Sequence, residues 1–512
     1  MTQWAEAPLD RTQTRMFHPT LDEMIPPDHS VRLFEEILRG CDWSAWEARY
    51  AVTLGQPAIH PRVVASAILY GLSHRIRSSR RLEWACDSAL DFLWLVQGRH
   101  IDHATFCDFR TRFAKELKDL FRQVAHVAMH LGLVRLNAVS LDGTKVRANS
   151  SRHETASAES IERRLGALDE EVARMLVEAE ATDAREADAF GDGVSPTRLP
   201  RELADAARRR EALAKALEAA RAKGAKVPVA DPESTIQPNK EGGFAPNYTP
   251  MAAVDAHRGF ILETDVLPDG DEGSATAPMV DAVAGTLGEM PKRLLADGPH
   301  GTGENLAALE ARGVEAYIPL PGRGGAADNP AKRADPTQRV PEGDRPRLPR
   351  NAQTGKLDRS AFVYDAGRDL YDCPMGKGLR FLHVRGKNPG RTERESRRYG
   401  GASCAGCPLA GDCLGRGATT RTVTRDEYEP LREATEGRMK TDAGRAIYAR
   451  RRWASETPFG FMKAWMGLRQ FLLRGLEKVK AEWLWACTAY NVRKLTREVA
   501  RMRVRFGLIG PG

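Results

Sequence analysis

Two strand-like stretches that each end on an aspartate constrain the fold of this chain more than any other feature. Residues 134–141 are mostly apolar and lead into Asp142, and residues 292–296 lead in the same way into Asp297. Taken alone, each aspartate is well explained as a turn residue, because each is followed by glycine and Asp-Gly pairs favour turns. The pair becomes informative through the elements that lie between the two stretches and after them.

The elements around these aspartates follow the order of a mixed α/β fold. A strand, a hairpin, a helix, a strand, a helix, a strand and a final helix, with two long insertions, is the element order of the ribonuclease H-like fold. The first and fourth strands of such a sheet are neighbours, so Asp142 and Asp297 are expected at adjacent carboxyl ends, where open α/β sheets bind ligands. The segments that give this order are the hairpin strands 251–254 and 260–266, the helix 274–288, the helix 304–312 and the strand 314–320.

A helix through residues 448–463 is predicted to supply a third acid. Residues four apart share one helix face, so Tyr448, Arg452 and Glu456 form a row. Lys463 returns to the same side about two turns after Glu456. Alone, Glu456 would be a surface acid, but with the two aspartates it completes a set of three carboxylates that suits Mg²⁺ or Mn²⁺. Two such ions about 4 Å apart can support an in-line displacement at phosphorus.

Short motifs spread over nearly the whole chain resemble the transposases of bacterial insertion sequences that carry a DDE catalytic triad. The helical stretch Tyr70–Arg112 is also similar to the helical N-terminal domain of that group. The motifs that carry the resemblance are Ser140–Asn149, Glu241–Phe244, Leu295–Asn305, Arg452-x3-Glu456-x6-Lys463 and Phe471–Lys478.

The resemblance implies a metal-dependent enzyme that acts on DNA. It makes Asp142, Asp297 and Glu456 the acids that bind Mg²⁺ or Mn²⁺, with two ions per active site. Arg452 and Lys463 correspond to the residues that hold DNA phosphates near the cut. We therefore expect the chain to bind insertion-sequence ends, to free a 3′-hydroxyl by cleavage, and to join that hydroxyl to target DNA by strand transfer.

Two positions depart from the pattern of the related transposases. Their signature tyrosine lies three residues before the arginine, whereas Tyr448 lies four before Arg452. Many of them carry tyrosine where His300 follows the second aspartate. Tyr448 and His300 are nonetheless both expected to contact DNA.

Residues 1 to about 130 are predicted to form an all-α N-terminal domain that binds DNA. The helix at 61–70 begins with Pro61, which is a favourable first residue, and Ser78 or Ser79 is expected to cap the next helix. Short amphipathic helices with basic connectors are typical of helix-turn-helix modules, and an ordinary helical bundle is the alternative. The side chains expected to contact DNA here are Arg75, Arg80 and Arg81.

Two insertions and a tail complete the predicted domain organisation. Residues 151–225 show helical spacing interrupted at 191–196, which predicts two antiparallel helices in a projecting arm. We interpret this arm as a solvated helical hairpin, with contact to DNA or to a second protomer as the alternative. The predicted domains are the catalytic core (131–320 and 440–490), the arm insertion (151–245), a linker and cysteine-rich insertion (321–439) and a basic tail (491–512).

Four cysteines form a second predicted metal site. Cys404 and Cys407 have the two-residue spacing of a zinc knuckle, and Cys373 and Cys413 would supply the remaining thiolates. Four sulfurs make a closed tetrahedral Zn²⁺ site, which is structural because no position is left for water. Reduced cysteines without metal are the alternative. The other cysteines, which are Cys41, Cys86, Cys107 and Cys487, are expected in the core.

Four tryptophans lie near the third acid or in the helix that follows it. Base stacking is one role for such side chains, because every base offers a π-face. Trp483 and Trp485 are expected to pack in the core, whereas Trp453 and Trp465 are open to either role.

The balance of charges agrees with a nucleic-acid partner. The chain has 77 Lys and Arg against 69 Asp and Glu, a net charge of +8, which suits a polyanion. No run of 18 apolar residues is present, the N-terminus lacks the pattern of a signal peptide, and eight cysteines are too few for a disulfide framework. We therefore expect a reducing, cytoplasmic location at the bacterial nucleoid.

The expected partner is double-stranded DNA, as terminal inverted repeats and as target. Synapsis of two ends implies at least a homodimer. Two other functions are compatible with part of this pattern: a catalytically inactive, domesticated DNA-binding protein, and a ribonuclease H-like nuclease without strand transfer. Cleavage of an end-repeat duplex distinguishes the first alternative from a transposase, and joined products distinguish the second.

Overall fold

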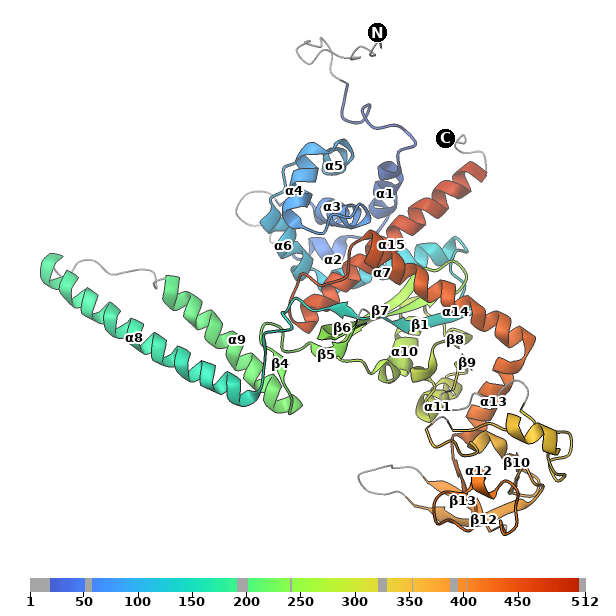
Figure 1. The fold of residues 1–512 in the computed structure, drawn as a ribbon. Helices are drawn as coiled ribbons and strands as arrows, with labels where there is room; N and C mark the ends of the chain where they lie inside the picture. Colours follow the sequence, from blue (N-terminus) through green and yellow to red (C-terminus); the bar gives the residue numbers. More distant parts are fainter. Residues whose placement is uncertain are drawn as a thin grey trace, which may run out of the picture.

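The computed structural model describes residues 19–50, 58–190, 201–239, 242–320, 329–351, 353–386, 395–401 and 403–505. A helical N-terminal part lies against a mixed sheet, a pair of long helices projects away from it, and a small β-rich unit lies beyond α13 (Figure 1). The fold class is therefore the predicted one: a mixed α/β core with an all-α N-terminal part, a helical arm and a small cysteine-rich insertion.

The central sheet has the strand order of a ribonuclease H-like core. Its main strands are β1 (Val139–Gly143), β6 (Phe244–Asp255), β7 (Ile261–Leu267), β8 (Arg293–Leu295) and β9 (Glu315–Tyr317). β6 pairs antiparallel with both β7 and β1, β1 pairs parallel with β8, and β8 pairs parallel with β9. The first and fourth strands of the core are therefore neighbours, as predicted. The short strands β2 (Val146–Arg147) and β5 (Thr235–Pro238) pair with the amino-terminal half of β6.

The register of β1 and β8 aligns the two predicted aspartates. Ser140 of β1 lies opposite Leu295 of β8. Asp142 and Asp297 each follow their partner residue by two positions, so both leave the sheet at the same edge. Ser140 and Leu295 are fully buried, and their pairing fixes the edge at which the acids emerge.

Helix α14 (Asp442–Gly460) packs directly on the strand that carries Asp142. Ser455 of α14 and Ser140 of β1 are both buried, and their hydroxyl oxygens lie 2.7 Å apart. Because a buried hydroxyl needs a partner, this contact holds the helix in one position on β1. Thr441 caps the start of α14, because its side chain accepts from the backbone N–H of Gly444.

Helices from distant parts of the chain cover the sheet. α10 (Thr276–Leu287) contacts β6 and β7, and α15 (Leu476–Arg505) contacts β7 and several N-terminal helices. α11 (Gly303–Ala311) and α13 (Glu429–Lys440) pack beside β9. No helix in the described part of the chain is long and apolar enough to span a membrane.

The regular secondary structure in the described residues of the N-terminal part is all helical, and hydrogen bonds join this part to the core. Ser78 caps one of its helices by accepting from the backbone N–H of Arg81, which confirms one of the two predicted caps. The Arg77 guanidinium donates to the carbonyls of Gly467 and Gln470 at 2.7 and 2.6 Å. The helices are α1 (Ser30–Arg39), α2 (Ser44–Glu47), α3 (Pro61–Ser73), α4 (Ser79–Ser88), α5 (Leu90–Leu95), α6 (His103–Arg112) and α7 (Ala114–His130).

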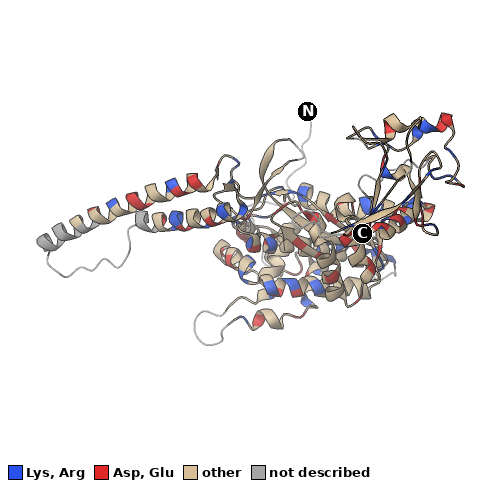
Figure 2. Cartoon of the chain, turned by 90° about the horizontal axis from the view of Figure 1, so that it is seen from below, with Lys and Arg blue, Asp and Glu red and all other residues tan. Residues whose placement is uncertain are grey.

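The arm is a pair of long helices in contact with each other, α8 (Ala158–Phe190) and α9 (Arg201–Lys223). At its base, β3 (Thr155–Ala156) pairs with β4 (Val227–Pro228). Positive and negative side chains are interspersed along both helices, as expected for a solvated hairpin (Figure 2). The predicted break at residues 191–196 lies outside the described residues.

The cysteine-rich insertion has a sheet and a hydrophobic core of its own. The segment predicted as a linker packs into this core where the structure describes it, since Ala331, Val340, Leu348 and Leu357 are buried there. Apolar residues spaced among the glycines, prolines and arginines of that segment make the contacts, although their density is too low for a helical or strand pattern. The five strands form one antiparallel sheet in sequence order: β10 (Val363–Asp365), β11 (Leu370–Asp372), β12 (Gly378–Arg385), β13 (Ser396–Gly400) and β14 (Val423–Asp426), with the short helix α12 (Ala410–Cys413) between the last two.

Residues 491–505, which were predicted to form a basic tail, instead continue helix α15. Apolar residues among the arginines are the reason, since Val492 and Leu495 are buried against the core. Arg503 pairs with Glu36 of α1 at 2.6 Å. Residues 506–512 lie outside the described residues.

Candidate active site

Asp142 and Asp297 converge on one arginine at the carboxyl ends of β1 and β8. Asp142 Oδ1 lies 3.2 Å and Asp297 Oδ2 lies 3.6 Å from the same nitrogen, Nη2 of Arg451 on α14. The side chains of Asp142 and Arg451 are only 19% and 20% exposed, and that of Asp297 is 38% exposed. The strand register thus brings the two acids together, and α14 supplies the cation between them.

The electrostatics of this pair favour a bound cation. Burial raises the pKa of the Asp142 carboxyl, the Arg451 guanidinium lowers it, and the nearby Asp297 raises it again. A neighbouring carboxylate disfavours the ionised form of Asp142, whereas the positive charge of Arg451 favours it.

Glu272 and His300 extend the acidic cluster behind Asp297. They lie in two short 3-10 turns that contact each other, η1 (Glu272–Ala275) and η2 (Gly298–His300). His300 is 0% exposed, and its Nε2 lies 3.6 Å from Asp297 Oδ1 and 3.9 Å from Glu272 Oε2. Burial raises the pKa of Glu272 to about 7, the neighbouring aspartates raise it as well, and burial lowers the pKa of His300. In this structure His300 therefore has no exposed surface for the DNA contact expected of it.

A pocket of about 520 Å³ connects Asp142 with Glu456 and Lys463, which all line it. The Glu456 side chain is 67% exposed, and its carboxylate lies 3.4 Å from Nε of Arg452, whose side chain is 84% exposed. The third predicted acid thus faces the same opening as Asp142. Its carboxylate pairs with Arg452 at the surface of α14 and not with the arginine between the aspartates.

Lys463 lies on a π-helical turn, η5 (Phe461–Trp465), that directly follows α14. Its Nζ donates to Thr144 Oγ1 at 2.6 Å and to the Lys145 carbonyl at 2.8 Å. Both acceptors lie just after Asp142 in the chain. Single π-helical turns are frequent at functional sites, and this one fixes an ammonium group at the wall of the pocket.

Sequence reasoning overlooked Arg451 and Glu272. Arg451 lies three residues after Tyr448, which is the spacing of the related signature, so the departure noted at Arg452 was the available signal. Tyr448 is partly buried beside these groups: burial raises its pKa, Arg451 lowers it and Asp297 raises it. Glu272 lies in a turn, outside any periodic pattern, and no sequence signal distinguished it.

The basic residues expected to contact DNA in the N-terminal part lie on the surface. Arg75, Arg80 and Arg81 are all exposed. The Arg75 guanidinium lies 4.0 Å from the ring centroid of Trp465, whose indole N–H donates to the Ser73 carbonyl at 2.9 Å. This contact brings the basic connector beside the π-helical turn. Among the tryptophans, Trp483 and Trp485 are buried as predicted, while Trp453 and Trp465 are 45% and 38% exposed.

The four predicted zinc ligands, Cys373, Cys404, Cys407 and Cys413, line one small cavity of the cysteine-rich insertion. Burial raises the pKa of Cys413 to about 11 and also raises that of Cys373. Two groups of at least three ligand atoms lie within 4.8 Å of one another among the described residues, and both are carboxylate–histidine groups without a cysteine. The four sulfurs thus share a cavity but are spaced more widely than in a metal-bound cluster.

Three of the four cysteines expected in the core follow that expectation. Cys86 and Cys487 are buried and Cys41 is partly buried. Cys107 is exposed, because α6 turns the neighbouring Phe106 inward and leaves residue 107 on the opposite face.

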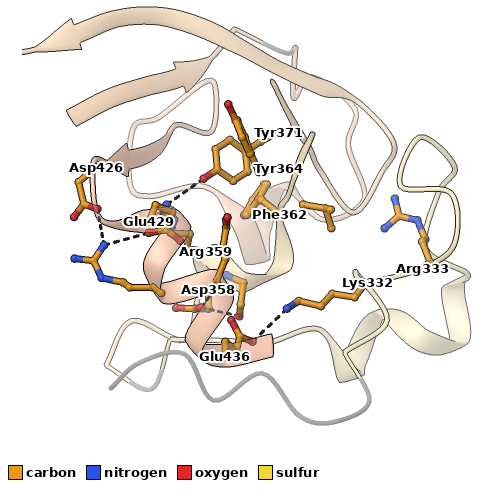
Figure 3. Close-up of a pocket in the computed structure, with 14 residues that line it drawn as sticks. Lys332, Arg333, Asp358, Arg359, Phe362, Tyr364, Tyr371, Asp426, Glu429 and Glu436 are labelled. Atoms are coloured by element: carbon orange, nitrogen blue, oxygen red, sulfur yellow. Dashed lines mark hydrogen bonds and ion pairs between the residues drawn. The ribbon is translucent and has the colours of Figure 1, made fainter. Parts of the chain in front are cut away.

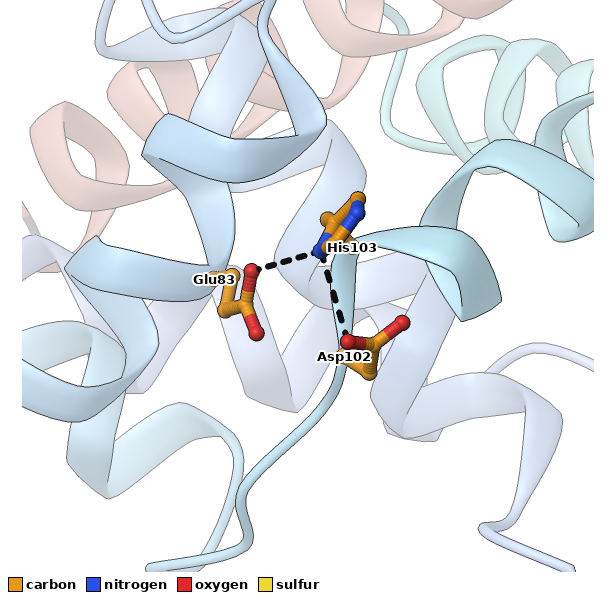
Figure 4. A group of neighbouring side chains, drawn as sticks. All are labelled: Glu83, Asp102 and His103. Carbon is orange, nitrogen blue, oxygen red and sulfur yellow. Dashed lines mark hydrogen bonds and ion pairs between the residues drawn. The ribbon is translucent and has the colours of Figure 1, made fainter.

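The second carboxylate–histidine group lies at the surface of the N-terminal part, where Glu83 of α4 approaches Asp102 and His103 at the start of α6 (Figure 4). His103 Nδ1 lies 2.9 Å from Glu83 Oε2 and 3.3 Å from Asp102 Oδ2. Asp102 also caps α6 by accepting from the Ala104 N–H. Because the histidine nitrogen is already paired, ion pairing between α4 and α6 explains this group.

A cavity of about 720 Å³ separates the cysteine-rich insertion from α13 (Figure 3). Its charges pair across the cavity: Lys332 Nζ lies 3.2 Å from Glu436 Oε1, and Arg359 Nη2 lies 3.0 Å from Glu429 Oε2. These ion pairs join the β-rich part of the insertion to α13, which packs beside β9 of the core. In these ion pairs each acid has its own cation, whereas Asp142 and Asp297 share Arg451.

The site formed by Asp142, Asp297 and Arg451 fits a divalent cation. Asp142 and Asp297 direct carboxylate oxygens to a position that already holds a positive group, the Arg451 guanidinium. Asp297 Oδ1 is buried and has no hydrogen-bond partner among the described residues. Such an oxygen-rich donor set is typical of Mg²⁺ and Mn²⁺ sites.

Comparison with known protein families identifies two transposase domains in the chain. The family described as transposase DDE domain matches residues 372–496, which include the later part of the cysteine-rich insertion, α14 with Glu456, and most of α15. The family described as transposase domain (DUF772) matches residues 19–112, which include α1 to α6. No curated protein matches the chain. Two transposase families thus match parts of the chain, and together they support a DDE-type transposase of the insertion-sequence type, a metal-dependent enzyme that cleaves nucleic acid.

Proposed function

We propose that the chain binds the ends of an insertion sequence and catalyses metal-dependent strand cleavage followed by strand transfer. The observation that carries the proposal is the convergence of Asp142 and Asp297 on Arg451, beside a pocket that Glu456 also lines. Asp142 thus belongs both to the pair that converges on Arg451 and to the pocket that Glu456 lines, although Asp142 and Glu456 are more than three hundred positions apart. A common ligand of high positive charge would account for this arrangement.

Asp142, Asp297 and Glu456 would hold Mg²⁺ or Mn²⁺, two ions per active site. Two bound metal ions would activate the attacking oxygen and stabilise the leaving oxygen. In the chain without metal, Arg451 neutralises the two aspartates and Arg452 neutralises Glu456. Each of the three acids thus has a positively charged group beside it.

Lys463 and Arg452 would bind the DNA phosphates beside the cut. Lys463 is suited to a fixed position, because two hydrogen bonds hold its ammonium group at the pocket wall. Arg452 is suited to reach out, because its side chain is almost fully exposed. Fixed positive groups beside a reacting phosphate stabilise the charge that develops in the transition state.

The exposed basic connector with Arg75, Arg80 and Arg81 would bind the DNA end outside the pocket. Its contact with Trp465 places this connector next to the π-helical turn that carries Lys463. One duplex could therefore contact both surfaces. Synapsis of two such ends requires at least a homodimer on DNA.

The test is cleavage of an end-repeat duplex by Asp142→Asn. We expect cleavage in Mg²⁺ to fall at least about a hundredfold, while affinity for the duplex is largely unchanged, because the acid acts on chemistry. Asp281→Asn is the matched control, since Asp281 is an exposed helix acid that pairs with Arg312 far from the pocket. Cleavage by Asp142→Asn at the wild-type rate would remove Asp142 from the active site.

The products of the same assay separate the remaining alternatives. Joined strands indicate a transposase, whereas hydrolysis without joined products indicates a nuclease. Binding without any cleavage by the wild-type chain, in either Mg²⁺ or Mn²⁺, indicates a domesticated DNA-binding protein.

We also propose that the cysteine cavity binds one structural Zn²⁺ through Cys373, Cys404, Cys407 and Cys413. The four thiols line one cavity, and ion binding would draw the sulfurs together and deprotonate them. Metal analysis should find about one zinc per chain, lost in Cys404→Ser. Cys107→Ser is the control, since Cys107 lies elsewhere on the surface. Equal zinc contents in wild type and Cys404→Ser would refute this assignment.

A further inference from the structure

Asp297 has two oxygens in different surroundings. Oδ2 faces Arg451, whereas Oδ1 faces His300 Nε2 at 3.6 Å. Oδ1 and Nε2 are both buried, and neither has a hydrogen-bond partner among the described residues. A buried polar atom without a partner costs about 1–3 kcal/mol, so two that face each other indicate a ligand between them.

The hydrogen bonds around His300 can hold the lone pair of Nε2 toward the acids. Thr276 Oγ1 lies 2.9 Å from Nδ1 and 2.8 Å from the Gly273 carbonyl. When the hydroxyl donates to that carbonyl, its oxygen accepts from Nδ1–H, and Nε2 is left as an acceptor. Asn305 Nδ2 lies 3.0 Å from Thr276 Oγ1 and 3.1 Å from the His300 carbonyl, and so fixes both groups. Histidines that bind metals are held in this way through their other ring nitrogen.

Glycines leave room for Glu272 at the same place. A Cβ at Gly143 would lie 2.6 Å from Glu272 Cδ, so only glycine lets this carboxylate lie against the end of β1. A Cβ at Gly273 would lie 2.9 Å from the Pro299 carbonyl, so the two 3-10 turns approach each other through their backbones. As a result the Glu272 carboxylate is 19% exposed and points toward His300.

We propose that Glu272, Asp297 and His300 bind a divalent transition-metal ion, at a position separate from the one that Asp297 shares with Asp142. The inference rests on the proposed active site, because Asp297 belongs to both positions. Ligand atoms about 2.1 Å from an ion lie roughly 3.0–3.5 Å apart. The observed spacings of 3.6 and 3.9 Å therefore need only a small contraction. The imidazole nitrogen favours Mn²⁺ over Mg²⁺, which prefers oxygen ligands.

The surface group of Figure 4 has the same three residue types in a different environment. His103 is 37% exposed, and its Nδ1 already has Glu83 at 2.9 Å. Neither the burial nor the unpaired nitrogen of the His300 group is repeated there. Glu83→Gln is therefore a matched control for Glu272→Gln.

The experiment titrates metal-free, full-length protein with Mn²⁺ and follows bound Mn²⁺ by electron paramagnetic resonance. Pulsed measurements on the same samples detect nitrogen coupled to the bound ion. We expect a nitrogen-coupled Mn²⁺ in the wild type that excess Mg²⁺ does not displace. Glu272→Gln should weaken its binding roughly tenfold or more, His300→Asn should remove the nitrogen coupling, and Glu83→Gln should change neither.

Three results would overturn the proposal: no nitrogen coupling in the wild type, wild-type Mn²⁺ affinity in Glu272→Gln, or loss of the coupled ion in Glu83→Gln. Because His300 is buried, thermal unfolding first verifies that His300→Asn is folded, and Glu272→Gln decides alone if it is not. Failure of this inference is distinguishable from failure of the proposed function. Cleavage that persists in Glu272→Gln with unchanged Mn²⁺ binding refutes only the inference, whereas a wild type that never cleaves refutes the proposed function.

Discussion

Replacement of Arg451 by methionine tests the idea that one guanidinium neutralises both aspartates. The change keeps an unbranched side chain of similar reach and removes the charge, which leaves Asp142 and Asp297 close together without a cation. Loss of one partner of a fully buried ion pair costs about 3–5 kcal/mol, and exposed pairs contribute about 0–1 kcal/mol. Since Arg451 is 20% and Asp142 19% exposed, we expect a loss of about 2 kcal/mol in the free energy of unfolding.

The assay is urea unfolding of Arg451→Met in EDTA and in Mg²⁺. A divalent ion should recover most of the loss, because an ion that binds only the folded state at a hundred times its Kd contributes about 2.7 kcal/mol. Arg450→Met is the control, since Arg450 is the neighbouring residue on α14 and is exposed. The reasoning is refuted if Arg451→Met is as stable as Arg450→Met in EDTA, or if Mg²⁺ stabilises both variants equally.

Three further predictions concern the sheet edge and the pocket. Burial raises the pKa of the Asp255 carboxyl from 3.8 to about 6, so the folded chain binds the proton of this group more tightly than the unfolded chain does. The stability that this proton contributes is full below about pH 4 and is lost as the pH rises through 6. Between pH 4 and 7 the wild type should lose about 2 kcal/mol relative to Asp255→Asn in urea unfolding, and parallel pH profiles would contradict this. Gly143→Ala should displace the end of Glu272 and press on the buried Met251 sulfur, so the free energy of unfolding should fall by about 1–3 kcal/mol while Mn²⁺ binding weakens; unchanged Mn²⁺ binding would contradict the close approach. Lys463→Met should lower end cleavage at least about tenfold, and a wild-type rate would remove the ammonium group from catalysis.

The core could be predicted because each strand and the acid at its end lie close together in the sequence, and the element order of the ribonuclease H-like fold makes the first and fourth strands neighbours. Each aspartate follows an apolar strand, and the parallel pairing of those strands leaves little choice of edge. The strands and the acids at their ends are therefore encoded within a few residues of each other. The same holds for the cap at Ser78, where the side chain and the amide that it accepts from are three residues apart.

The cation of the site could not be predicted in the same way. Residues 451 and 452 both lie on helix faces compatible with the pocket. The four-residue spacing from Tyr448 to Arg452 and from Arg452 to Glu456 favoured Arg452 as the residue that faces it. Which of the two points at β1 depends on the rotation of α14 about its axis, and the buried contact between Ser140 and Ser455 sets that rotation. That contact joins residues more than three hundred positions apart, so it is a tertiary property. Glu272 was missed for a related reason, since its position depends on the contact between two turns.

The length of the arm has a consequence for how far one protomer extends. α8 has 33 residues, which at a rise of 1.5 Å per residue makes a rod of about 50 Å. That equals the length of about fifteen base pairs of duplex at 3.4 Å each. An arm of this length would reach more than one helical turn along a duplex bound at the proposed catalytic pocket.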